Sequence, residues 1–269
     1  MKIIFLEGVS GVGKSTTVDQ LGKILHEQGY ATRGYLEGDP ESPLDLCWVA
    51  YLTNEAFEDL LSANPLCADA LSKNSICRDD YVLLRYQVGS AGLYSTALNA
   101  TLREHEFCYR PSNCPPFAQF KAVFHDQWAQ FAANAGENWD YLIFDGSLIG
   151  HMASDMLRNY RATVEEMAAF LETLVQTIRH FQPIVFYLSS SDVGGRLQKA
   201  RHSRGQSPAT CESIEFWCKR EQVDRQILRG LSVESHILDI SDGQWDEAIS
   251  TIVARIAGND VHGDGEFHE

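Results

Sequence analysis

Residues 8–15 read GVSGVGKS and fit the pattern G-x-x-x-x-G-K-[ST] without a gap. An apolar run at residues 3–6 precedes the motif, and a segment of helical character at residues 16–26 follows it. This order predicts a buried strand, a tight turn and a helix whose first backbone N–H groups face a phosphate. A plain glycine turn between a strand and a helix is the alternative, and the complete motif in this context disfavours it.

The motif assigns a task to each of its positions. Lys14 is expected to reach the β- and γ-phosphates, and the Ser15 hydroxyl is expected to ligate Mg²⁺. Glycines allow the backbone to approach the phosphates closely. The predicted nucleotide-binding residues are Gly8, Ser10, Gly11, Val12, Gly13, Lys14, Ser15 and Thr16.

Composition narrows the class of protein. The chain has 269 residues and a formal net charge of −15. A sequence-independent nucleic-acid binder is usually basic, so we expect no nucleic-acid partner. The seven cysteines form no C-x-x-C pair, which favours reduced, mostly buried thiols. No signal peptide or membrane-spanning run is evident, so we expect a cytoplasmic protein without a membrane partner.

Short apolar runs alternate with helical patterns along the chain. Residues 2–7, 31–37, 141–145, 184–188 and 236–240 are expected to form strands. Such alternation predicts an α/β fold with a parallel sheet. The last helix is expected at 245–257, and the tail 258–269 is expected to be disordered. One domain, residues 1–257, accounts for the pattern.

Nearly a hundred residues, about 40–139, separate the second and third predicted strands. This segment is too long for a simple crossover, so we expect an inserted helical region for substrate. Its helical segments are predicted at 44–61, 79–105 and 116–135. Arg78 and Arg85 lie seven residues apart, as on one helix face, and are candidates to bind substrate. Trp48 is a candidate to stack on a substrate ring.

Carboxylates follow two of the predicted strands. Asp145 ends the third strand, where it could bind Mg²⁺ directly or through water, or simply cap a turn. Glu37 and Asp39 follow the second strand. Because the carboxyl ends of parallel strands face the ligand crevice, either residue could bind the acceptor and take its hydroxyl proton. An ordinary acidic turn is the alternative at this position.

Five basic or histidine side chains occur within nine positions, 196–204, although the chain is acidic overall. The residues are Arg196, Lys199, Arg201, His202 and Arg204. Such a segment, about 194–210, can form a lid that closes over a triphosphate and stabilises charge in the transition state. A solvated basic helix is the alternative interpretation.

Together these motifs resemble the P-loop kinases of the thymidylate kinase and deoxynucleoside kinase group. The resemblance implies a three-layer α/β fold with a five-stranded parallel sheet in the order 2-3-1-4-5. It also implies that Arg196, Arg201 and Arg204 belong to the lid, and that the loop carrying Asp242 contacts adenine. The family carries an Arg close to the acidic residue that ends its third strand, whereas this chain continues from Asp145 with Gly146 and Ser147.

The sequence therefore predicts a kinase that uses ATP and Mg²⁺ and phosphorylates a hydroxyl of a small molecule. Lys14 and the lid arginines would stabilise the transferring phosphoryl group, and Glu37 or Asp39 would act as the base. The acceptor is open between a nucleoside or nucleotide, a specialised metabolite and a cell-wall sugar nucleotide. A nucleotide-dependent switch that hydrolyses NTP without an acceptor is the alternative from another class. A homodimer is also left open.

Overall fold

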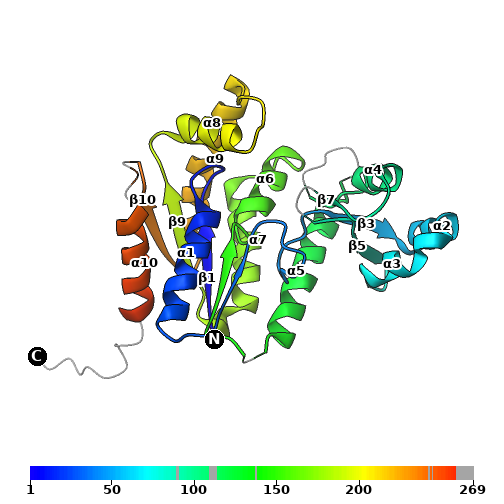
Figure 1. Ribbon diagram of the computed structural model, residues 1–269, viewed down its shortest axis with the longest axis horizontal. Coiled ribbons are helices and arrows are strands. Elements are labelled where there is room, and N and C mark those ends of the chain that lie inside the picture. The colour runs from blue at the N-terminus through cyan, green and yellow to red at the C-terminus, as the bar shows by residue number, and fades with distance from the viewer. Residues whose placement is uncertain (89–90, 109–113, 137, 242, 244, 259–269) are drawn as a thin grey trace, which may run out of the picture.

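The computed structural model describes residues 1–258 except 89–90, 109–113, 137, 242 and 244. Five parallel strands form its central sheet, in the order β10-β9-β1-β8-β2 (Figure 1). Their bounds are Lys2–Glu7 (β1), Thr32–Tyr35 (β2), Tyr141–Asp145 (β8), Ile184–Ser189 (β9) and Glu234–Asp239 (β10). Counted along the chain, these strands lie in the order 2-3-1-4-5, which confirms the predicted α/β fold and strand order.

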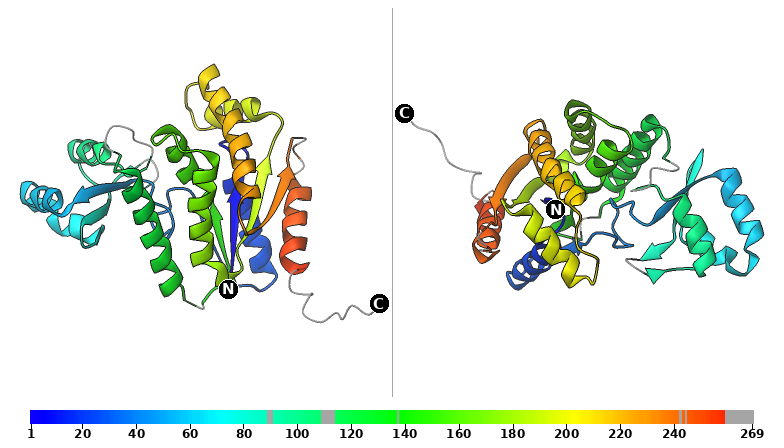
Figure 2. Two further views of the ribbon diagram at one scale, coloured as in Figure 1. Left: turned by 180° about the vertical axis from the view of Figure 1, so that it is seen from behind. Right: turned by 90° about the horizontal axis from the view of Figure 1, so that it is seen from above.

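Apolar residues on both sides of the strands explain why helices cover both faces of this sheet. Ile4 and Leu6 of β1 face α1 (Lys14–Glu27) and α10 (Trp245–Gly258). Ile3 and Phe5 face the opposite layer, which includes α5 (Phe117–Asn134), α7 (Val164–Thr177) and α9 (Cys211–Arg229). The two helical layers lie on opposite sides of the sheet in Figure 2. In the described residues, no helix has the length and apolar character needed to cross a membrane.

The carboxyl ends of the strands lead into the segments that matter for function. The phosphate-loop motif joins β1 to α1, and α6 (Gly150–Arg158) follows β8. After β9, α8 (Val193–Ser203) packs against α9 above the phosphate loop. The predicted lid, about 194–210, therefore consists of α8 and the loop before α9. A short 3-10 helix, η2 (Arg179–Phe181), precedes β9.

The inserted region differs from the helical prediction. Residues 44–61 contain β3 (Val49–Thr53), and residues 79–105 contain β5 (Tyr81–Arg85), β6 (Gln87–Val88) and β7 (Ala91–Gly92). A further strand, β4 (Ser75–Cys77), lies between these two ranges. Among these, β3, β5 and β4 form an antiparallel sheet. The prediction of a helix at 116–135 is confirmed by α5. The other helices are α2 (Asn54–Ala63), η1 (Pro65–Cys67), α3 (Ala68–Lys73) and α4 (Thr96–Glu104).

A separate small core explains why this region forms strands. Alternate residues of β3 and β5, including Ala50, Leu52, Val82 and Leu84, pack with Phe57 of α2. A period of two is typical of a strand with one buried face. A run such as YVLLR can be a short strand or part of a helix, because its periodicity alone does not decide. The insert projects to one side of the main sheet (Figures 1 and 2).

Candidate functional site

The phosphate loop folds tightly over the end of β9 and against the helices beside it. Gly8 has a φ of 140°, and a Cβ there would lie 2.5 Å from the carbonyl oxygen of Leu188. Gly13 has a φ of 89°, and its Cβ would clash with the ring of Trp245. Both positions therefore require glycine. The loop borders a cavity of about 510 Å³ at the carboxyl end of the sheet.

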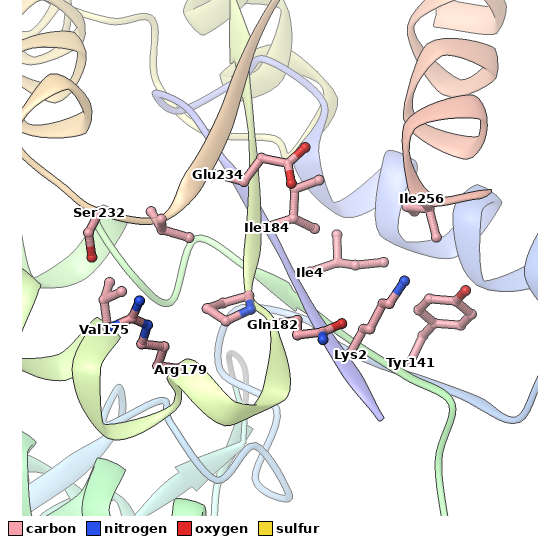
Figure 3. Close-up of a pocket in the computed structure, with 12 residues that line it drawn as sticks. Lys2, Ile4, Tyr141, Val175, Arg179, Gln182, Ile184, Ser232, Glu234 and Ile256 are labelled. Carbon is pink, nitrogen blue, oxygen red and sulfur yellow. The ribbon is translucent and has the colours of Figure 1, made fainter. Parts of the chain in front are cut away.

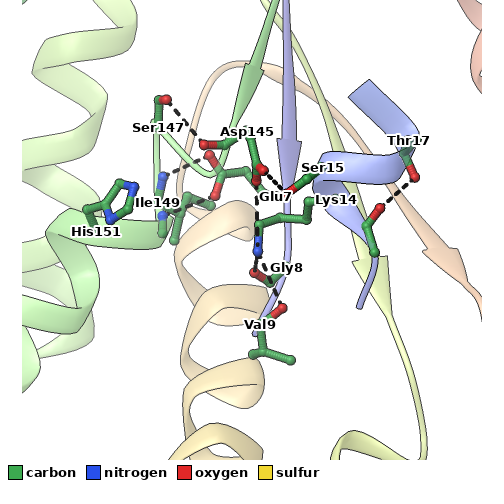
Figure 4. A network of polar contacts seen from close by, with 12 residues as sticks. Glu7, Gly8, Val9, Lys14, Ser15, Thr17, Asp145, Ser147, Ile149 and His151 are labelled. Atoms are coloured by element: carbon green, nitrogen blue, oxygen red, sulfur yellow. Dashed lines mark hydrogen bonds and ion pairs between the residues drawn. The ribbon is translucent and has the colours of Figure 1, made fainter. Parts of the chain in front are cut away.

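Lys14 and Ser15 line this cavity, and both contact the buried Asp145 behind them (Figure 4). The Ser15 hydroxyl donates to Asp145 Oδ2 at 2.5 Å, and Lys14 Nζ lies 4.0 Å from Asp145 Oδ1. Lys14 also donates to the carbonyl oxygens of Gly8 and Val9 at 3.0 and 3.4 Å. Burial raises the pKa of Asp145, while Lys14 and Ser15 oppose that rise. Ser15 and Asp145, each predicted as a ligand of Mg²⁺, thus contact each other across 130 residues of sequence.

These groups fit a hard cation. Asp145 Oδ1 is buried and has no hydrogen-bond partner among the described residues. A buried carboxylate oxygen without a donor is expensive unless an ion or water satisfies it. Hydroxyl and carboxylate oxygens are also the ligands that Mg²⁺ prefers. Ser15 and Asp145 could therefore hold Mg²⁺.

Three arginines from separate elements line the same cavity: Arg158, Arg204 and Arg220. Arg204 was predicted as a lid residue, whereas Arg158 and Arg220 were not predicted from the sequence. Arg158 ends α6 and stacks on the ring of Phe216, with its guanidinium carbon 3.8 Å from the ring centre. These residues supply positive charge at the cavity, although the two positions directly after Asp145 are Gly146 and Ser147 rather than an arginine.

Arg220 is 1% exposed and lies in a polar network on α9. Its Nε donates to Asp224 at 2.6 Å, and its Nη atoms donate to the carbonyl oxygens of Ile149 and Gly150 at 3.1 and 3.0 Å. It also donates to the Ser154 hydroxyl. This network ties α9 to the start of α6 and fixes the guanidinium at the wall of the cavity.

The two predicted bases occupy different places. Glu37 is exposed and lines the cavity beside the phosphate loop. Asp39 instead pairs with Arg33 at 3.5 Å and accepts from the Glu41 N–H at 2.9 Å, and it is not among the lining residues. The structure therefore favours Glu37 over Asp39 as the group near a bound acceptor.

A buried polar cluster connects the loop after β2 to α6. Cys47 Sγ lies 3.4 Å from His151 Nδ1, and Asp45 Oδ2 lies 4.0 Å from His151 Nε2. Burial alone would raise the pKa of Asp45, but His151, Cys47 and the Gly38 N–H hold that pKa below its usual value. His151 also lines the phosphate-loop cavity. Sequence reasoning missed this cluster, because Asp45 and His151 are 106 positions apart.

The remaining lid arginines point elsewhere. Arg196 donates to the Ser190 hydroxyl at 2.9 Å and to the carbonyl oxygen of Ile240, and it lies over the ring of Trp245. It therefore lies beside the segment that was predicted to contact adenine. Arg201 Nε donates to the carbonyl oxygen of Ser207 within the lid at 2.5 Å. Asp242, predicted to bind nucleotide, lies outside the described residues.

Three predicted substrate-binding residues lie away from the phosphate loop. Arg78 and Arg85 do not share a helix face, because Arg78 precedes β5 and Arg85 ends it. Arg78 donates to Gln130 of α5 at 2.6 Å. Trp48 packs against the small core of the insert, with its Nε1 close to Gly38. None of these three residues is among those that line the phosphate-loop cavity.

A second cavity of about 370 Å³ lies at the opposite end of the sheet (Figure 3). Lys2, Tyr141, Ile184 and Glu234, at the amino ends of four strands, contribute to its lining. Ligands of open α/β sheets bind at the carboxyl ends of the strands. We therefore place the functional site at the phosphate loop.

Comparisons with known proteins give distant structural likenesses. No family model and no curated protein matches the chain. It is similar to the YorR protein from Bacillus subtilis, crystallised with phosphorylated GDP, with 15% identity, a TM-score of 0.45 and coverage of 98% of this chain and 100% of that chain. It is also similar to shikimate kinase from Acinetobacter baumannii in complex with shikimate, with 11% identity, a TM-score of 0.39 and coverage of 97% and 96%. These likenesses are too distant to carry an argument about activity.

Proposed function

We propose that the chain is a kinase that uses ATP and Mg²⁺ to phosphorylate a hydroxyl of a small molecule. The observation that carries this proposal is one cavity lined by a complete phosphate loop and three arginines, with Ser15 of that loop bonded to Asp145. Phosphoryl transfer depends mainly on positioning and on stabilising the charge of the transferring group. Clustered cations at a phosphate loop suit that demand.

Each side chain has a defined part in the proposed reaction. Lys14 would bind the β- and γ-phosphates, and Ser15 and Asp145 would hold the metal. Bound Mg²⁺ would neutralise phosphate charge in the transition state. Glu37 would orient the acceptor hydroxyl and take its proton. Arg204 would bind the donor phosphates from the lid, while Arg158 and Arg220 would provide positive charge on the side of α6.

The test begins with Lys14→Ala. We expect this variant to lose phosphoryl transfer by orders of magnitude while it keeps its circular dichroism spectrum and melting temperature. Lys23→Ala, on the exposed side of α1, is the matched control and should retain activity. Transfer from labelled ATP is measured against a panel of nucleosides, nucleotides and hydroxylated metabolites. Near-normal transfer by Lys14→Ala would refute the mechanism.

The same assay separates the switch alternative. A nucleotide-dependent switch would hydrolyse ATP or GTP slowly and would leave every acceptor in the panel unlabelled. Its affinity for a protein partner would change with the bound nucleotide. The arginines around the cavity favour the kinase, because a switch needs no second pocket for an acceptor.

A further inference from the structure

A third cavity, of about 350 Å³, lies under the loop that follows β2. Its walls come from that loop, from the strands of the antiparallel sheet and from α5. The described residues that line it are not shared with the phosphate-loop cavity. It is therefore a separate space, and the proposed kinase reaction does not use it.

Arg85 lines this cavity. Its guanidinium has no ionic partner in the described part of the chain. Its Nη1 is buried and has no hydrogen-bond partner among the described residues. No carboxylate in the described part of the chain lies within 4.0 Å of its guanidinium. Burial lowers the pKa of Arg85, with Asp45, Cys47 and Asp39 opposing that effect. A half-buried guanidinium without an ionic partner destabilises the folded protein unless an anion binds to it.

Two more side chains at the cavity each have one polar atom without a hydrogen-bond partner among the described residues. Ser42 is 6% exposed, and its hydroxyl has no hydrogen-bond partner among the described residues. Gln127 of α5 donates its Nε2 to the carbonyl oxygen of Pro43 at 2.7 Å, which leaves its Oε1 without a donor. Buried polar groups are nearly always satisfied, so each such atom calls for a water, an ion or a ligand.

The polar side chains at this cavity determine which chemical groups of a ligand could bind there. Arg85 and Ser42 can donate to an anionic oxygen, whereas Gln127 can accept from a hydroxyl. Lys73, at the end of α3, adds a second cation at the exposed side. Asp45 also lines the cavity, but its two carboxylate oxygens accept from the backbone N–H groups of Gly38 and Cys47 at 2.6 and 2.8 Å.

We propose that this cavity binds a small hydroxylated anion, with the anionic group on Arg85 and Ser42 and a hydroxyl on Gln127. The anionic group is a carboxylate or a phosphate monoester, because both accept from a guanidinium. This site does not require the chain to be a kinase, so its test stands apart from the transfer assay.

Malate and glycerol 3-phosphate are the two probes, because each carries a hydroxyl beside its anionic group. Binding of each probe to the full chain is measured by isothermal titration calorimetry. The measurement is repeated with Lys14→Ala, since a phosphate loop can also bind phosphate. Binding that survives in Lys14→Ala belongs to the new site. Binding of malate alone identifies a carboxylate site, and binding of glycerol 3-phosphate alone identifies a phosphate site.

Arg85→Met should weaken binding of the probe by about tenfold or more, as expected for loss of a hydrogen bond to a charged group. Arg103→Met removes an exposed arginine from α4 of the same insert and should leave the affinity unchanged. Ser42→Ala should weaken binding by a smaller factor and serves if Arg85→Met does not fold. The proposal is overturned if neither probe binds at millimolar concentration, or if Ser42→Ala and Arg85→Met bind as wild type does.

Discussion

Glu7 ends β1 immediately before the phosphate loop and is fully buried. Its Oε1 accepts from the N–H groups of Leu148 and Ile149 at 2.7 and 3.1 Å, and its Oε2 accepts from the Gly150 N–H at 3.0 Å. The carboxylate thereby caps the start of α6. Burial raises the pKa of Glu7 from 4.5 to about 7, although these N–H groups and Lys14 oppose the rise.

This pKa makes stability depend on pH in a defined direction. The folded state holds the Glu7 proton more tightly than the unfolded state does, because the folded pKa is the higher one. The stability from this group is therefore present at low pH and is lost as pH rises from 4.5 towards 7. Between about pH 5 and about pH 8, the loss amounts to about 2.5 kcal/mol. Glu7→Gln cannot ionise and should not show this loss.

Urea denaturation of wild type and Glu7→Gln at several pH values measures the effect. Glu7→Gln loses some stability at every pH because its cap of α6 is weaker. As pH rises, however, the unfolding free energy of wild type should fall relative to that of the variant. Subtracting the two curves cancels other titrating groups, including Asp155, whose pKa burial raises to about 7. Glu27→Gln, at an exposed position of α1, controls for the loss of a charge. Curves for wild type and Glu7→Gln that run parallel would refute the reasoning.

Two further substitutions test the same region. Asp145→Asn should lower transfer by about 100-fold or more and raise the Mg²⁺ concentration needed for half activity. A magnesium titration of the transfer rate measures both effects. An unchanged magnesium requirement would contradict the assignment of Asp145 as a metal ligand. Arg220→Met should lower the unfolding free energy by about 3–5 kcal/mol, because it leaves the buried Asp224 without its ionic partner, although the Tyr187 hydroxyl still donates to Asp224. Urea denaturation beside the exposed control Arg229→Met measures this loss, and equal stability of the two variants would count against the network.

The parallel sheet could be predicted because its signals are local. The central strands β1, β8 and β9 contain short apolar runs, and the run from Ile184 to Ser189 is buried throughout. The phosphate loop fixed the first strand and the first helix, and alternating β/α units then permit few arrangements. The strand order itself came from the family resemblance. It could not be derived from the apolar pattern, because β1, β8 and β9 are all apolar and buried, and this pattern does not show which strands are neighbours.

The insert could not be predicted in the same way. Val49–Thr53 and Tyr81–Arg85 become strands because each finds the other as a partner, with Tyr51 opposite Leu83. The sequence between them includes two helices and a short strand, so the pairing is not a simple hairpin. Neither run is long enough for its hydrophobic periodicity to distinguish a strand from a helix. The prediction of a helix at 79–105 led to the wrong expectation that Arg78 and Arg85 lie on one helix face.

At the candidate site, Lys14 and Ser15 could be placed together because they belong to one local motif. Asp145 could be placed near them because it ends a strand that was expected beside β1. Arg220 does not, since KRE at 219–221 reads as the exposed face of a charged helix. Asp224 lies one turn further along α9, but only the contact of α9 with the start of α6 buries Arg220 and gives it two carbonyl oxygens as partners. The burial of this arginine leaves no local signal.

The charge around the cavity connects these findings to the acidic composition of the chain. Among the described lining residues, four are cations (Lys14, Arg158, Arg204 and Arg220) and one, Glu37, is a carboxylate. The whole chain has 22 Lys and Arg against 37 Asp and Glu. Walls of low dielectric concentrate the field of the cations inside the cavity, while the acidic exterior repels large polyanions. This distribution therefore favours a small anion that fits the cavity over a large polyanion. It is compatible with the proposed binding of a nucleoside triphosphate by an acidic protein.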